Sequence, residues 1–145
     1  MSESKAVLRT KSSSRALNIT LWVAQLIVAL FFVWAGGMKL MTPINQLAAM
    51  WPWTGELPAG IVRFLGAIDL AGGIGVLLPA LTRIKPRLTV LAALGLVVLQ
   101  ICAVIFHASR GEFPALPFNA VLIVFCAFVL WGRSKKIPFQ ARSST

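Results

Sequence analysis

Four long apolar stretches occupy most of this sequence and constrain its fold more than any other feature. They cover about 17–41, 60–81, 88–108 and 113–131. Each is close to the roughly 20 residues that a helix needs to cross about 30 Å of hydrocarbon. Because a bilayer interior offers no water to the backbone, these segments are expected to be helical. The sequence therefore predicts an all-α membrane protein built as an antiparallel bundle of four transmembrane helices.

The positions of the basic residues predict the orientation of this bundle. The net charge of +10 would suit a nucleic-acid-binding protein. However, eleven of the fourteen Lys and Arg residues lie before the first stretch, between the second and third, or after the fourth. If the helices alternate in direction, all eleven lie on one side. The positive-inside rule then places both termini in the cytoplasm and explains the charge without nucleic acid.

The predicted organisation is one membrane domain over 17–133, flanked by basic cytoplasmic tails at 1–16 and 134–145. The N-terminal Ser-rich residues 1–14 and the last six residues are expected to be disordered. A cleaved signal peptide is the competing interpretation of the N-terminus. The first apolar run of about 20 residues exceeds the 7–15 of a signal peptide, which favours a retained span in the inner membrane.

The connection between the first two stretches contains a Trp-Pro-Trp sequence, Trp51 to Trp53. Tryptophans at the boundary of a span commonly lie at the level of the lipid headgroups. Residues 44–50 are expected to form a short interfacial helix beside them. A membrane anchor is the favoured role of this segment, and a functional lid is the alternative.

The second stretch carries an acidic residue among small residues. Asp69 lies about nine residues into the predicted span, or about 13 Å by helical rise. Gly66, Gly72 and Gly73 surround it in the helix and predict close packing against a neighbouring helix. An ionised carboxylate at that depth costs at least about 2.5 kcal/mol unless it is paired, hydrated or protonated. Asp69 is therefore expected to have polar partners.

Each of the other stretches also contributes polar side chains. We expect a polar pocket formed by Lys39, Asp69, Gln100 and His107, supported by Gln25 and Asn119. Three further charged residues are expected to form a network at its rim: Arg63, Arg110 and Glu112. The alternative is that these groups bind nothing and only fix the packing of the helices.

The sequence has no residue pattern typical of a metal site, a disulfide or a phosphate-binding loop, and no catalytic residue is predicted. His107 is the sole histidine and therefore a weak candidate for a metal ligand. Cys102 and Cys126 are expected at different depths, as buried apolar side chains without a disulfide. The glycine cluster of the second stretch has no strand-to-helix context, so it does not indicate a phosphate-binding loop.

Several motifs resemble the DoxX-like family of four-helix integral membrane proteins. They are Ala35–Leu40, Arg63–Gly75, Phe106–His107 and Arg110–Glu112. The resemblance implies a four-helix bundle and marks the following polar positions as characteristic: Lys39, Arg63, His107, Arg110 and Glu112. The family usually has glutamate where this chain has Asp69, and the shorter acid reaches less far toward Lys39.

The resemblance implies an accessory component of a membrane redox system, without catalytic activity of its own. No cofactor is identified, and a quinone is the candidate ligand, with Phe32, Trp34 and Phe106 as aromatic residues that could flank its ring. The favoured alternative is that these three are ordinary lipid-facing or packing residues. The expected partners are the lipid bilayer and either a membrane redox protein or a second copy of the chain. One alternative is an assembly factor or chaperone for another membrane protein. Another is a small-solute permease, which would need to oligomerise because one copy has four spans.

Overall fold

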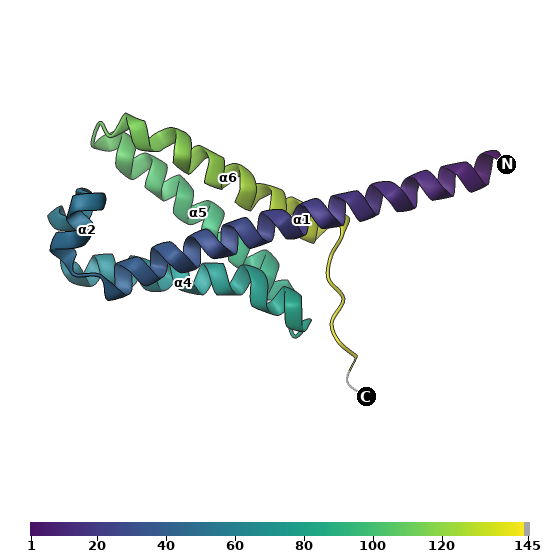
Figure 1. The fold of residues 1–145 in the computed structure, drawn as a ribbon, viewed down its shortest axis with the longest axis horizontal. Coiled ribbons are helices and arrows are strands. Elements are labelled where there is room, and N and C mark those ends of the chain that lie inside the picture. Colours follow the sequence, from purple (N-terminus) through teal and green to yellow (C-terminus); the bar gives the residue numbers. More distant parts are fainter. Residues whose placement is uncertain (144–145) are drawn as a thin grey trace.

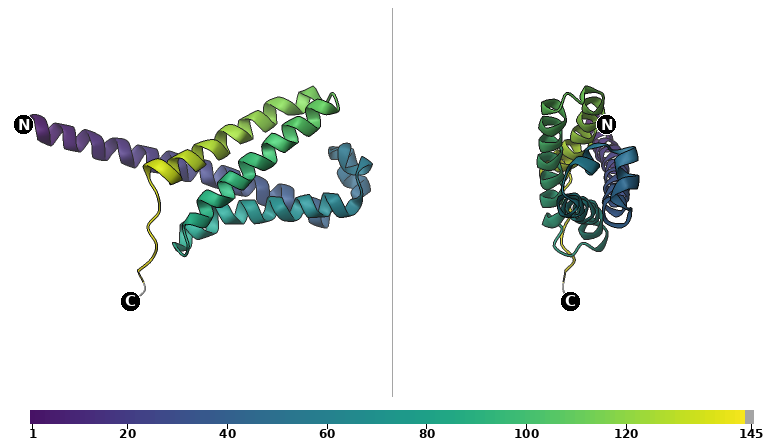
Figure 2. Two further views of the ribbon diagram at one scale, coloured as in Figure 1. Left: turned by 180° about the vertical axis from the view of Figure 1, so that it is seen from behind. Right: turned by 90° about the vertical axis from the view of Figure 1, so that its left-hand side faces the viewer.

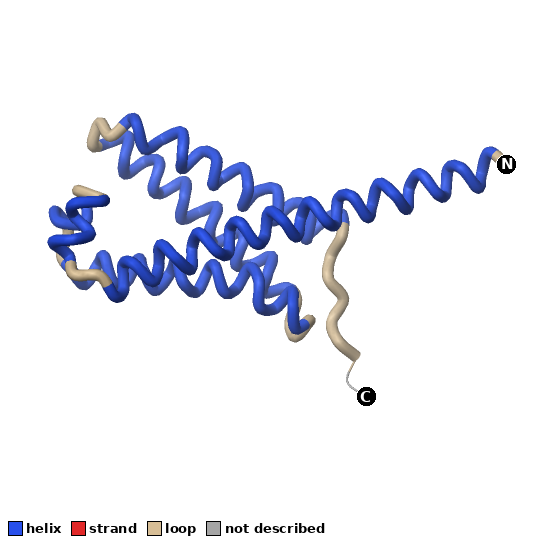
Figure 3. Tube along the Cα trace, in the orientation of Figure 1, coloured by secondary structure: helices blue, strands red, loops and turns tan. Residues whose placement is uncertain are grey.

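The computed structural model describes residues 1–143 and is helical through most of its length (Figure 1, Figure 3). Its elements in order are α1 (Ser2–Met41), α2 (Ile44–Met50), α3 (Trp53–Glu56), α4 (Ala59–Thr82), α5 (Arg87–Ser109), the 3₁₀ turn η1 (Phe113–Ala115), α6 (Leu116–Trp131) and the π-helical turn η2 (Gly132–Lys136). The four long segments, the last running from Phe113 to Lys136, are long and apolar enough to span a membrane. The predicted all-α architecture with four apolar helices is confirmed.

Helix α1 begins much earlier than the sequence predicts, at Ser2 rather than near Leu17. The expected disorder of residues 1–14 is therefore wrong. Thr10 and Ser14 direct their hydroxyls to the carbonyls of Val7 and Lys11, at 2.9 and 3.1 Å, instead of competing with the helix. Extending a helix that already exists avoids the cost of nucleation. These first turns are exposed and project beyond the bundle (Figure 1).

The helices form two antiparallel hairpins. Helix α1 packs most extensively against α4, and α5 packs against α6, while α4–α5 and α1–α6 contacts join the pairs. Gly36 and Gly66 lie where α1 crosses α4. A Cβ added to Gly36 would lie 2.7 Å from the Gly66 carbonyl oxygen, closer than real Cβ contacts. Glycine at this crossing lets the two backbones approach, as the small residues of the second span predict.

The two hairpins are close together at one end and diverge at the other (Figure 1, Figure 2). We call the divergent end, which carries α2, α3 and η1, the loop end. The opposite end, which carries the α4–α5 connection and η2, is the terminal end. The buried apolar core joins all four long helices and includes Phe32, Val76, Leu96 and Cys126. Beyond this core, α2 and α3 lie across the loop end.

Candidate functional site

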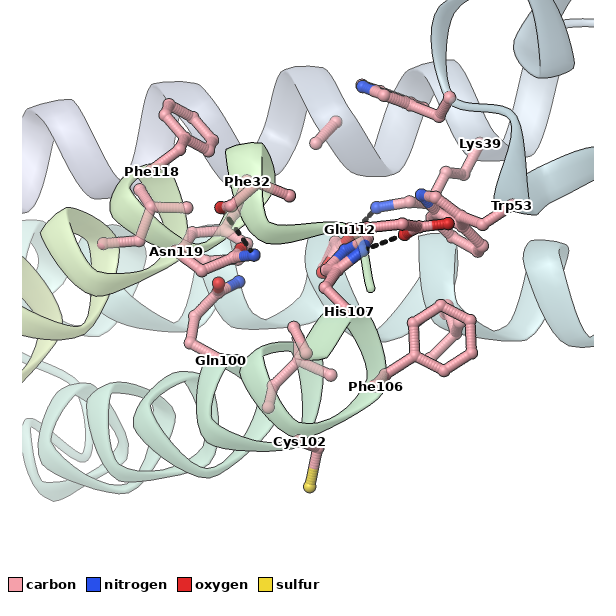
Figure 4. A pocket seen from close by; sticks show the side chains of 18 of the residues that line it. Phe32, Lys39, Trp53, Gln100, Cys102, Phe106, His107, Glu112, Phe118 and Asn119 are labelled. Carbon is pink, nitrogen blue, oxygen red and sulfur yellow. Dashed lines mark hydrogen bonds and ion pairs between the residues drawn. The ribbon is translucent and has the colours of Figure 1, made fainter. Parts of the chain in front are cut away.

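A cavity of about 710 Å³ lies at the loop end and has walls from both hairpins and from the α2–α3 segment (Figure 4). Its lining is mainly apolar and rich in aromatic rings. The aromatic residues of the wall are Phe31, Phe32, Trp51, Trp53, Phe106 and Phe118. Against this apolar background, each polar group that reaches the cavity has a marked effect on what can bind there.

Lys39 and Asp69 form a direct ion pair between α1 and α4, with Nζ 2.5 Å from Oδ2. Their side chains are only 14% and 6% exposed. The small residues at the α1–α4 crossing bring the two backbones close, which lets the shorter acid reach the lysine directly. Both residues line the cavity, so the pair forms a charged but mutually compensated part of its wall.

Trp51 and Trp53 of the loop form part of this wall, whereas the sequence favoured a membrane anchor for their segment over a functional lid. The Lys39 ammonium lies 5.3 Å from the ring centroid of Trp51 and 5.8 Å from that of Trp53. Both contacts are within the range of cation–π attraction. Trp34, a candidate to flank a bound ring, is half-exposed and contacts Trp51 outside the cavity lining, as the favoured alternative of a lipid-facing or packing residue predicts.

His107 connects the cavity to a charged cluster at the surface of the loop end. Its Nδ1 lies 2.5 Å from Glu112 Oε2, and Arg110 donates from Nε to the other oxygen of the same carboxylate at 2.8 Å. Arg110 also donates from Nη2 to Glu56 of α3, at 2.5 Å. Gly111, with φ of +70°, makes the tight turn that allows Arg110 and Glu112 to meet.

These contacts change the acidity of the groups in the turn. The hydrogen bond from His107, together with that from Arg110, lowers the pKa of Glu112 below its ordinary value. The hydrogen bonds to Glu112 and Glu56 raise the pKa of Arg110. Glu112 is therefore ionised over the physiological range, as an acceptor that holds His107 Nδ1 and leaves Nε2 without a hydrogen bond within residues 1–143.

Two amides, Gln100 and Asn119, complete the polar lining (Figure 4). Asn119 donates from Nδ2 to the Ala115 carbonyl at 3.1 Å, within its own helix. Gln100 is 6% exposed, and its Oε1 is buried without a hydrogen-bond partner in the described part of the chain. A buried acceptor without a donor costs free energy, on the order of 1–3 kcal/mol. A ligand with a donor could remove this cost.

The structure brings four predicted pocket residues, Lys39, Asp69, Gln100 and His107, to one cavity. It places Gln25, expected to support the pocket, and Arg63, expected in the rim network, elsewhere. Gln25 lies toward the terminal end, where it donates to the Val76 carbonyl at 2.9 Å. Arg63 does not join the rim cluster of Arg110 and Glu112. Its Nη1 donates to the carbonyls of Lys39 and Thr42 at the end of α1.

The two cysteines are free, in agreement with the prediction that they form no disulfide. Cys126 is buried, whereas Cys102 is exposed on α5 although burial was expected. Figure 4 shows the Cys102 sulfur pointing away from the other labelled side chains. Within the described residues, no group of three or more His, Cys, Asp or Glu side chains is arranged to hold a metal ion.

Comparison with known proteins gives one family match. The model of the DoxX-like family matches residues 23–129, which include α4 and α5 entirely, most of α6, part of α1 and the polar residues of the cavity. No curated protein and no solved structure gives a significant match.

Proposed function

This chain belongs to the DoxX-like family, and from its four apolar helices and its cavity we propose that it is an accessory component of a membrane redox system that holds a quinone-type ring. The membrane-spanning character rests on the family match and on the helices. The redox role and the ligand are our proposals. A quinone would supply its own redox chemistry, and this chain would bind and orient it.

The observation that carries the proposal is the pairing of an apolar, aromatic cavity with a few polar groups that face it. A volume of about 710 Å³ lies within the range of roughly 300–1,000 Å³ that is typical of small-molecule sites. Lys39 can donate to a ring oxygen. His107 Nε2, with Nδ1–H donating to Glu112, can accept from a ring hydroxyl, as can Gln100 Oε1, which has no partner within residues 1–143. This combination suits a flat ring with oxygen atoms at its edge.

Binding of a short-tail ubiquinone analogue to the purified protein tests this proposal. Trp51 and Trp53 line the cavity, so quenching of tryptophan fluorescence is a suitable readout. Ala103 also lines the cavity, and Ala103→Phe should abolish most of the quenching by filling it. The matched control is Ala67→Phe, because Ala67 is exposed on α4 and is not part of the lining. Equal binding by both variants would contradict the proposal.

Identification of retained molecules separates this role from the two alternatives. Protein purified in mild detergent should retain quinone, and Gln100→Leu should retain less because it loses the unpaired acceptor. Recovery of one stoichiometric membrane protein without quinone would favour an assembly factor. Solute uptake by vesicles that contain the purified chain would favour a permease.

We further propose that the chain lies in the inner membrane with both termini in the cytoplasm. Eleven of the fourteen basic residues belong to the two terminal segments, the α4–α5 connection and the first residue of α5, which supports this orientation under the positive-inside rule. Reporter fusions to each terminus, read by fluorescence in the cytoplasm and by phosphatase activity outside it, test the proposal. Termini on opposite sides of the membrane would contradict it.

A further inference from the structure

A buried arginine at the terminal end has no acidic partner within residues 1–143. Arg133 is 1% exposed, although it is one of the largest side chains in the protein. It donates from Nε to Gln25 Oε1 at 2.6 Å and from Nη1 to Asn18 Oδ1 at 2.7 Å. Within residues 1–143 it makes no ion pair. A fully buried cation held only by neutral groups leaves its charge uncompensated.

The Arg133 guanidinium also has N–H groups that lack an acceptor within residues 1–143. Nη1 makes a second, longer bond to the Ile137 carbonyl at 3.3 Å, while Nη2 is buried with no partner in the described residues. The ring of Phe139 lies 4.1 Å from Arg133 Cζ, and that of Trp22 lies at 5.4 Å. Aromatic faces attract a cation but provide no acceptor for an N–H group. An anion with oxygen acceptors would therefore both compensate the charge of Arg133 and accept a hydrogen bond from Nη2.

Arg133 forms part of the wall of a second hollow, distinct from the loop-end cavity. This groove, of about 680 Å³, lies between the start of α5 and the segment that follows α6. Arg87, an exposed second cation, lines it together with Ser134 and Phe139. The groove continues along α5 past Leu88, Leu91 and Leu94, which are 44%, 62% and 46% exposed. The groove therefore has a basic end, at Arg87 and Arg133, that continues into an apolar surface along α5.

We propose that this groove is a binding site for an anionic phospholipid, whose phosphate pairs with Arg133 and Arg87 and whose acyl chain lies along the leucines of α5. Phosphate oxygens accept charge-assisted hydrogen bonds from guanidinium groups, often two at once. The apolar continuation favours a lipid over free phosphate, because a soluble ion would leave the leucine surface unused. The site is independent of the quinone proposal, since it shares no lining residue with the loop-end cavity.

Native mass spectrometry of the full-length protein tests this site. Delipidated protein in neutral detergent is offered phosphatidylglycerol and phosphatidylcholine with identical acyl chains. We expect a preference for phosphatidylglycerol, and Arg87→Gln should weaken that binding about tenfold by removing one charge-assisted contact. Lys135→Gln is the matched control, because Lys135 is an exposed neighbouring cation outside the groove lining. It should change the binding less than about twofold, within the scatter of a surface charge.

Further variants and competing ligands distinguish a specific lipid site from general electrostatic attraction and from a site for soluble phosphate. Arg133→Gln, where it folds by circular dichroism, should lose the preference for the anionic lipid. Leu91→Ser should weaken lipid binding through the acyl chain. Equal loss with Arg87→Gln and Lys135→Gln would mean general electrostatic attraction and would overturn the proposal. Full competition by inorganic phosphate or glycerol 3-phosphate, with Leu91→Ser unchanged, would assign the site to a soluble phosphate and also overturn it.

Discussion

Lys39 and Asp69 each stabilise the other's charge in a largely buried position between α1 and α4. Removal of one partner should therefore cost more than removal of both. We expect Lys39→Met to destabilise the protein by about 3–5 kcal/mol, because it leaves a buried carboxylate without its cation. The double variant Lys39→Met/Asp69→Leu should recover most of that loss. Unfolding of the four proteins of this cycle in one detergent gives the coupling energy.

Losses that simply add in this cycle would contradict a direct interaction between the two side chains. Asp69→Asn completes the comparison, since it keeps the shape of the acid and removes its charge. A further readout is binding of the quinone analogue. If the pair only fixes the packing, the double variant should bind as well as the unchanged protein once it is folded.

The turn at the loop end should loosen in acid because of Glu112. Its pKa is lowered by the hydrogen bonds from His107 and Arg110, so the folded state favours the ionised form. The resulting stabilisation is complete above the ordinary pKa of glutamate, about 4.3, and is lost as pH falls through the lower value in the folded protein. Amide exchange at Gly111 and Glu112, corrected for intrinsic rates, should lose protection in that window.

Glu112→Gln is the control for this pH dependence. A neutral amide cannot titrate, so the exchange protection of the same amides should be lower at neutral pH and should not fall further in acid. Retention of the acid transition in this variant would assign it to another group and contradict the role of Glu112.

The polar residues of the cavity could be predicted from sequence because a charged or amide side chain within an apolar helix needs a partner. The expectation that Gln25 supports the pocket did not account for how far this residue lies from Lys39 along the helix axis. Gln25 precedes Lys39 by fourteen residues on α1, about 21 Å along a helix, so it lies in the other half of the bundle. The positions of Trp51 and Trp53 depend on how the α2–α3 segment folds back over the loop end, and no periodicity in the sequence encodes that path.

At the level of elements, the α1–α4 crossing should tolerate no side chain at Gly36. A Cβ there would lie 2.6 Å from the Leu70 amide nitrogen as well as against the Gly66 carbonyl, and neither backbone atom can turn aside. We expect Gly36→Ala to destabilise the bundle by about 1–3 kcal/mol, the usual cost of overpacking. The apparent melting temperature in detergent measures this effect.

The adjacent residue provides the matched control. A Cβ at Gly37 would meet no atom within 4 Å, in the same helix and one residue away. Gly37→Ala should therefore be neutral or stabilising by up to about 1 kcal/mol, since alanine has the higher helix propensity. Equal destabilisation by both substitutions would mean that helix propensity or lipid contact, rather than the crossing, determines the result.

The boundaries of the helices show which features the sequence encodes locally. Helices α4 and α5 begin and end within one residue of the predicted limits, because Pro58 and Pro86 precede them and hydropathy falls at their ends. The expected helix over 44–50 is α2. The start of α1 was missed because a polar, Ser-containing segment can continue a helix whose nucleus lies in the adjacent apolar span.

At the scale of the whole molecule, the two ends of the bundle have different electrostatic character. The loop end contains three acidic residues, Glu56, Asp69 and Glu112, each paired with a basic side chain. The terminal end combines a basic segment, Arg83–Arg87, with the basic turn η2, whose Arg133 makes no ion pair within residues 1–143. Compensated charge thus surrounds the cavity, whereas the opposite end has an excess of positive charge that suits an anionic lipid surface.

This asymmetry leads to a prediction about insertion. Replacing Arg83, Lys85 and Arg87 with Gln, while introducing Asn45→Lys and Gln46→Lys at the loop end, reduces the charge difference that orients the helices. We expect a mixed population in which some chains insert with inverted topology, measured by the ratio of fluorescent to phosphatase reporter activity at the C-terminus. Arg83→Lys/Arg87→Lys is the control, because it keeps the charge and should keep a single orientation. If the charge-shifted chain also inserted in a single, unchanged orientation, the eight basic residues of the two terminal segments would be sufficient to set the topology, and the connection would have no orienting role.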